Sequence, residues 1–158
     1  MTRTVRLNLT LRCTEDAAWR ALRQPAGLIA ISAPLLRVRC VDTQPDVWPQ
    51  DTPVLIRLKL LGLIPMGSQT VRITETIEPD GSRSVTDSGS PVSGPLRMMR
   101  NWNHRMSVRA SADVPERCEF RDRLVVDAGW LTLPVWVSMW LLWQYRATRL
   151  RSVARTWH

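Results

Sequence analysis

The sequence predicts an α+β fold, in which an antiparallel, curved sheet of seven strands wraps around one long C-terminal helix. Apart from a short helical stretch, the residues before position 128 alternate apolar and polar side chains with the two-residue period of β-strands. The segment 130–145 then has no charged side chain and is rich in tryptophan, which predicts a buried helix. A two-faced sheet followed by an apolar helix implies that the helix lies across the sheet.

The first strand and two short helices open the chain. The strand is predicted because four apolar side chains point to one side of it, namely Val5, Leu7, Leu9 and Leu11. Thr14 is a typical helix N-cap, and the two acids that follow it suit the first turn of a helix that we expect to end at Pro25. A second short helix is expected over about residues 26–31, before Pro34.

Six further strands follow, antiparallel where hairpins join them. We expect them over residues 36–40, 54–61, 69–77, 82–89, 96–110 and 117–127. The turn 79–81 has the sequence Pro-Asp-Gly, which favours a hairpin between its two flanking strands.

The last helix is expected over residues 132–155, about 36 Å at 1.5 Å per residue. Pro134 falls in its first turn, where a missing N–H has no helical partner to lose. A stripe at i, i+4 and i+7 is formed by Trp136, Trp140 and Trp143.

Length and cysteine content bound the class of protein. The 158 residues suit one domain, 1–158, that buries roughly 68–70% of its unfolded surface. Cys13, Cys40 and Cys118 are odd in number and lack CxxC spacing, so neither a disulfide framework nor a zinc site is expected. The N-terminus lacks the apolar block of a signal peptide, and 130–145 is shorter than the about 20 residues of a membrane span. We therefore expect a cytoplasmic protein without a transmembrane segment.

The net charge of +8 raises the question of nucleic acid. Lys59 is the single lysine, and the arginines are scattered along the chain without forming a basic run. On the strands they alternate with apolar residues, as a solvated face does. Nucleic acid is therefore not the expected partner, although an arginine-rich outer face could still bind another macromolecule.

The order strand, two short helices, six strands and long helix resembles the helix-grip fold of the START and polyketide-cyclase superfamily, also called SRPBCC. The residues that carry the resemblance are Asp87, the segment 102–104 (Trp-Asn-His), Asp122 and the segment 127–129 (Asp-Ala-Gly). They are similar to those of small bacterial ligand-binding members. The resemblance implies a deep cavity between sheet and helix, used in the superfamily for lipids, sterols, polyketides and other hydrophobic molecules. It does not imply an enzyme.

Strand alternation places three polar residues on the inner face. Asp87, His104 and Asp122 lie on consecutive strands, so they could sit side by side in an apolar cavity. A buried carboxylate is costly unless it is paired, and a histidine between two acids would supply the pairing. The three residues could form a purely structural network, orient a ligand, or allow His104 to act as a general acid or base.

The candidate ligand-binding residues combine this polar group with apolar neighbours. They are Asp87, Trp102, His104, Asp122, Trp136, Trp140, Ile56, Leu58, Val71 and Ile73. Core packing alone could also explain the tryptophans, because burying one is worth roughly 4–6 kcal/mol at ~25 cal/mol/Å². No phosphate-binding loop, nucleophile elbow or HExxH motif is present, and His104 and His158 are the only histidines. Neither a cofactor nor a metal is expected.

The leading hypothesis is therefore binding of a hydrophobic small molecule, aromatic, polyketide-like or lipid, in a central cavity. The enzymatic alternative is a polyketide cyclase, aromatase or dehydratase-like catalyst with His104 as acid or base. The third hypothesis is a macromolecular interaction through the arginine-rich outer face.

Overall fold

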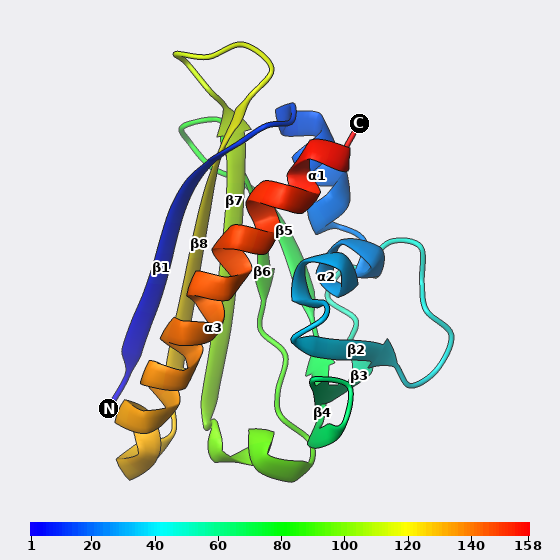
Figure 1. Cartoon of the computed structure of the whole chain (residues 1–158), viewed down its shortest axis with the longest axis vertical. Helices are drawn as coiled ribbons and strands as arrows, with labels where there is room; N and C mark the ends of the chain where they lie inside the picture. The colour runs from blue at the N-terminus through cyan, green and yellow to red at the C-terminus, as the bar shows by residue number, and fades with distance from the viewer.

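The structure, a computed structural model of residues 1–158, confirms the α+β helix-grip fold. Its strands form two antiparallel sheets with a long C-terminal helix across the larger one (Figure 1). The larger sheet has the order β1 (Arg3–Leu11), β8 (Cys118–Asp127), β7 (Asn101–Ala110), β6 (Arg83–Asp87) and β5 (Ile73–Ile77). The smaller sheet has the order β2 (Leu36–Cys40), β3 (Val54–Leu60) and β4 (Ile64–Val71).

The structure has eight strands rather than seven, because the strand expected over 69–77 is divided. β4 ends at Val71 and β5 begins at Ile73. The backbone N–H of Arg72, between them, donates to Asp87 Oδ1 at 3.0 Å, so a side chain takes the place of a ladder partner at this residue. The division lets the chain pass from the smaller sheet to the larger one.

The strand expected over 96–110 begins only at Asn101. The residues before it form a short 3-10 helix, η1 (Gly94–Met98), with a proline in its first turn. Proline fixes φ and removes a backbone donor, which suits a helical turn better than the start of a central strand.

The three α-helices are α1 (Glu15–Leu22), α2 (Pro25–Ser32) and α3 (Thr132–Val153). Thr14 caps α1 as expected, because its Oγ1 accepts from the N–H of Ala17 at 3.2 Å. Pro25 does not end α1; it is the first residue of α2, a position that tolerates its missing N–H. A 3-10 turn at 154–156 extends α3.

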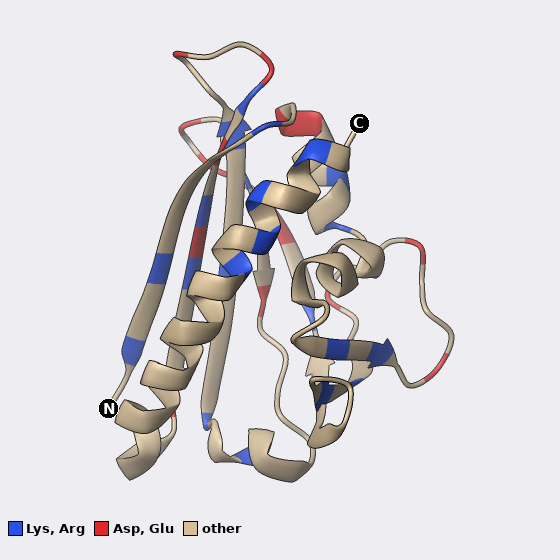
Figure 2. Ribbon diagram, in the orientation of Figure 1, with Lys and Arg blue, Asp and Glu red and all other residues tan.

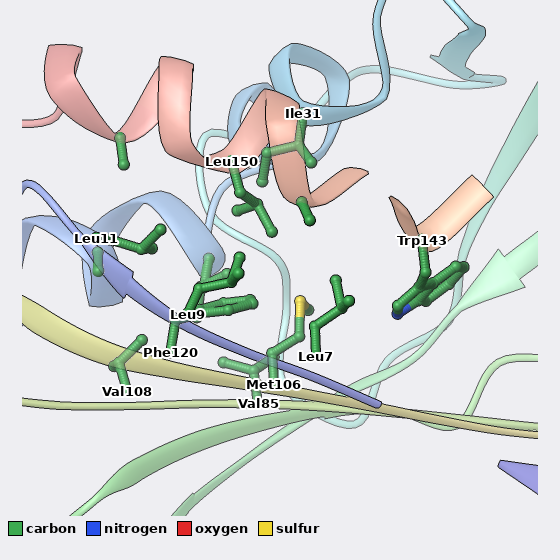
Figure 3. Close-up of a cluster of buried hydrophobic side chains, with 14 of the residues drawn as sticks. Leu7, Leu9, Leu11, Ile31, Val85, Met106, Val108, Phe120, Trp143 and Leu150 are labelled. Carbon is green, nitrogen blue, oxygen red and sulfur yellow. The ribbon is translucent and has the colours of Figure 1, made fainter. Parts of the chain in front are cut away.

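The core lies between the inner face of the larger sheet, the two short helices and the second half of α3 (Figure 3). Inner side chains of the sheet meet α2 and α3 there, and the largest fully buried ones include Leu11, Ile31, Phe120, Leu124 and Leu150. No helix is long and apolar enough to cross a membrane.

The first half of α3 departs from the expectation of a buried helix. Leu133 is 55% exposed and Trp140 45%, whereas Trp143 and Leu150 in the second half are buried. Trp130, in the 3-10 turn η2 (Gly129–Leu131) that precedes the helix, is 86% exposed. The helix crosses the sheet obliquely (Figure 1). The start of the helix lies near β1, which is the edge strand of the sheet. Only its second half therefore has protein on more than one side.

Candidate functional site

A buried carboxylate, Asp122, is the centre of the polar cluster. Its Oδ1 accepts hydrogen bonds from His104 Nε2 at 2.8 Å and from Trp143 Nε1 at 2.9 Å. Its Oδ2 accepts from Arg146 Nε at 3.1 Å. Burial alone would raise the pKa of Asp122, but the nearby imidazole and guanidinium, with these hydrogen bonds, lower it to about 2. The group is therefore a carboxylate at neutral pH, and it joins β7, β8 and α3.

Strand register and helix periodicity bring these four side chains together. Met106 is the direct cross-strand partner of Asp122, so His104 is a diagonal neighbour of Asp122 on the same face of the sheet. On α3, Trp143 and Arg146 are three residues apart and share the buried face of the helix. Arg146 also donates through Nη2 to Met106 Sδ at 3.1 Å.

The ring of His104 is held in one orientation, with one nitrogen free. An ionised Asp122 can only accept, so Nε2 of His104 carries the proton in their hydrogen bond. Trp102 and Trp143 contact the ring edge-on, with centroids 6.0 and 5.2 Å away. The chain offers Nδ1 no hydrogen-bond partner. This nitrogen can accept a proton when the ring is neutral or donate one when it is charged.

Asp87 lies on β6 directly opposite His104 but does not hydrogen-bond it. Its Oδ1 accepts from the backbone N–H groups of Arg72 and Gly89, and its Oδ2 accepts from Trp102 Nε1 at 3.1 Å. Burial raises the pKa of Asp87, and these hydrogen bonds only partly oppose it. His104 therefore does not bridge two acids; it binds Asp122 alone.

The cluster borders an apolar cavity of about 40 Å³. Its lining comes from the three α-helices, the loop before β3 and both sheets: Ala21, Leu22, Leu28, Ile31, Trp48, Val71, Ile73, Asp87, His104, Met106 and Arg146. Such a volume holds about one water molecule, whereas ligand pockets of drug-sized molecules are about 300–1,000 Å³. The structure thus lacks the ligand-sized cavity that the sequence led us to expect.

Four of the residues expected to bind a ligand line this cavity: Asp87, His104, Val71 and Ile73. Asp122 lies behind His104, from where it orients the ring. Trp102 is half-buried and holds both Asp87 and the His104 ring.

The other expected residues lie elsewhere. Ile56 is buried in the core and Leu58 is half-buried against it. Trp136 donates through Nε1 to the backbone oxygen of Thr4 at 3.0 Å, at the sheet's edge. Trp140 is exposed and is not part of the cavity wall, because α3 turns this face away from the core.

Several residues of the site are not among the sequence-derived candidates, and Arg146 and Trp48 are two of them. The charge of Arg146 favours an exposed position, but its spacing from Trp143 places it on the buried stripe. Trp48 is buried and lines the cavity from an irregular loop, where no periodic pattern marks inward-facing side chains.

The arginine-rich outer face carries a second, open groove of about 430 Å³ without hydrophobic lining. Arg123 faces Arg6 on one neighbouring strand and Arg105 on the other. Arg105 forms an ion pair with Glu78, which also lines the groove. Like charges directly opposite one another destabilise a sheet, so an anion on this face would relieve repulsion.

Solved structures share this fold. Protein CV1439 from Chromobacterium violaceum is 12% identical, aligns over 96% of each chain and has a TM-score of 0.64. A norcoclaurine synthase point mutant from Thalictrum flavum, in complex with a transition-state analogue, is 8% identical over 98% of this chain and 94% of that chain, with a TM-score of 0.64. The Zhui aromatase/cyclase from Streptomyces is 13% identical over 98% and 94%, with a TM-score of 0.59.

At these identities the comparisons show the fold alone, which is the helix-grip fold. No protein-family model and no curated protein matches the sequence. Another norcoclaurine synthase structure, 9% identical with a TM-score of 0.60, contains dopamine and hydroxybenzaldehyde.

Proposed function

We propose that this chain binds a small apolar molecule that carries a hydrogen-bonding group, at the cavity between the larger sheet and the helices. The observation that supports this proposal best is a buried, oriented imidazole with a free Nδ1 at the wall of an apolar cavity. Arg146 lines the same wall and offers further N–H donors. A site that orients a ligand typically has a small number of polar groups that converge in an apolar pocket.

The ligand class follows from this lining. Leu22, Leu28, Ile31 and Ile73 would contact an apolar body, while His104 and Arg146 would meet a carbonyl, hydroxyl or carboxylate group. The aromatic molecules in the norcoclaurine synthase complex, which has the same fold, support an aromatic or polyketide-like ligand.

Binding requires the cavity to enlarge. The wall opposite the sheet is formed by α2 and by Trp48, and α2 has no side-chain cap at its N-terminus. We infer that α2 and the Trp48 loop move outward when a ligand enters. A ligand then binds only the fraction of molecules that are open, so its apparent affinity is reduced by that fraction.

The first experiment is native mass spectrometry of the purified protein, followed by extraction of any apolar molecule that travels with it. Binding of that molecule, or of a panel of aromatic ketones and phenols, is then measured for the wild type, Trp48→Ala and Trp19→Ala. We expect Trp48→Ala to bind more tightly because it enlarges the cavity. Trp19, which lies outside the cavity wall, provides the control. Equal affinities for all three proteins would contradict binding at this cavity.

A second candidate function is acid–base catalysis, and the His104–Asp122 pair favours it. A carboxylate that fixes one imidazole nitrogen and leaves the other free is the arrangement of a general base. The reaction would be cyclase, aromatase or dehydratase-like, with His104 removing a proton next to a carbonyl group and Asp122 as the positioning residue.

His104→Gln separates the two functions, because glutamine can still donate to Asp122 but has no basic nitrogen. Turnover of the extracted molecule, followed by mass spectrometry, should fall about 10²–10⁴-fold if His104 is the base. A change confined to ligand preference would support binding without catalysis.

The third hypothesis, a macromolecular partner on the outer face, draws support from the opposed arginines in the open groove. Such binding should weaken steeply with salt and should be lost in Arg123→Glu. Salt-insensitive binding would count against it.

A further inference from the structure

One end of the molecule exposes apolar side chains from three separate segments, which we call the apolar end. They come from η2 with the first half of α3, from the β3–β4 turn with the start of β4, and from the loop around η1, towards the bottom of Figure 1. Its exposed side chains are Trp130, Leu133, Val137, Trp140, Leu141, Leu61, Leu63, Ile64, Val92 and Met98. Trp130 at 86% and Leu63 at 79% are almost fully in water. Monomeric proteins seldom expose apolar side chains grouped in this way.

Short-range contacts join the three segments into one surface. A Cβ on Gly67 of β4 would meet the backbone of Ser93 and Gly94, at the start of η1. The N–H of Arg100, after η1, donates to the backbone oxygen of Asp127, the last residue of β8, which η2 connects to α3. The segments of the apolar end are therefore neighbours in space.

The charges around the apolar end are basic. Arg97 and Arg100 are exposed there, and the guanidinium of Arg100 lies against Gly129, next to Trp130. Arg3 lies over the Trp136 ring, 5.8 Å from its centroid. The acid at this end, Asp127, pairs with the N-terminal ammonium at 2.9 Å. Figure 2 shows most of the remaining acidic residues towards the opposite end.

We propose that the apolar end docks on the surface of an anionic lipid bilayer. Trp130 and Leu133 would insert at the boundary between headgroups and acyl chains, while Arg97 and Arg100 would contact lipid phosphates. Tryptophan and leucine beside arginine is the composition of segments that lie in this interface, and each basic residue near an anionic surface adds attraction. No helix can span the bilayer, so the contact is confined to its surface.

A second copy of the chain is the less favourable occupant. Stable dimers bury about 800 Å² per partner. The apolar end consists only of a turn, a loop and the start of a helix. A symmetric dimer would also bring the arginines of two copies together, and an anionic membrane neutralises them instead.

The test is flotation of the protein with lipid vesicles. Wild type should float with vesicles of phosphatidylcholine and phosphatidylglycerol, much less with phosphatidylcholine alone, and less at raised salt. The double variant Trp130→Ser/Leu133→Ser should reduce flotation about tenfold or more, because it removes the inserted apolar area. The matched control, Ile77→Ser/Val114→Ser, removes exposed apolar residues at the opposite end and should float like wild type.

A charge variant tests the arginines separately. Arg97→Glu should weaken flotation with anionic vesicles, whereas Arg121→Glu on the outer face of the sheet should not. Failure of the wild type to float with anionic vesicles at low salt would overturn the proposal. So would a wild-type dimer, seen by sedimentation, that Trp130→Ser/Leu133→Ser converts to a monomer without changing flotation. The proposal does not depend on ligand binding at the buried cavity.

Discussion

Replacing Asp122 with asparagine should destabilise the protein strongly. The amide oxygen can still accept from His104 and Trp143, but the amide nitrogen would then face Arg146 Nε, donor against donor. The buried guanidinium would lose its only carboxylate partner. Breaking a buried ion pair in this way costs about 3–5 kcal/mol, which corresponds to about 6–20 °C in melting temperature for a chain of this size.

The effect of Asp122 should depend on pH in a defined direction. Its pKa is about 2 in the folded protein instead of 3.8, a difference worth about 2 kcal/mol. Because the folded-state pKa is the lower one, this stability is fully present above the unfolded-state value and is lost as pH falls from about 4 towards 2. The wild type should lose this contribution over this pH range. Asp122→Asn lacks the titrating group and should show no corresponding loss.

The assay is urea unfolding at several pH values for the wild type, Asp122→Asn, Arg146→Met and the double variant. If the two positions are coupled, the double variant should lose less unfolding free energy than the two single variants lose together. A loss below about 1 kcal/mol for Asp122→Asn at neutral pH would refute the buried ion pair. So would identical acid unfolding of the wild type and Asp122→Asn.

Three further predictions concern single positions. Gly67→Ala should cost at least about 2 kcal/mol in urea unfolding, because φ is +111° and the new Cβ would lie 1.9 Å from a backbone oxygen; Gly81→Ala, with open space around it, should cost less. Asp87→Asn should gain stability relative to wild type as pH rises from 3 to 7, because the pKa of Asp87 is raised by burial and its ionisation opposes folding; an unchanged difference between the two pH values would contradict this. Under native conditions a thiol reagent should label Cys40 first, as followed by mass spectrometry, because the other two cysteines are buried; equal rates would contradict their burial.

The sequence predicted which faces of the strands point inward. Two-residue alternation placed Asp87, His104 and Asp122 on the inner face, and the strand register has all three there, buried. Alternation is reliable here because a one-residue slip would bury the arginines of the same strands. What it could not give was the pairing: which acid binds His104 depends on the diagonal offset between strands and on a helix far away in the chain.

The parts that were not predictable depend on tertiary contacts. The break between β4 and β5 arises because Arg72 binds a side chain from another strand, and no local pattern marks such a residue. The inward position of Trp48 is set by a loop without periodicity. The exposure of Trp140 follows from the angle of α3 over the sheet, whereas an uncharged run by itself suggested burial.

The buried cluster also determines which wall of the cavity can move. Asp122 binds both Trp143 and Arg146, so charge-assisted hydrogen bonds without access to water hold the second half of α3 on the sheet. The α2 segment is joined to α3 by two bonds to its backbone oxygens, from Tyr145 and from Arg149, which are only partly buried. Water can replace those bonds at little cost, but it cannot reach Asp122. An enlarged cavity should therefore form on the α2 side, which is closed by apolar contacts, Trp48 and these two partly exposed hydrogen bonds.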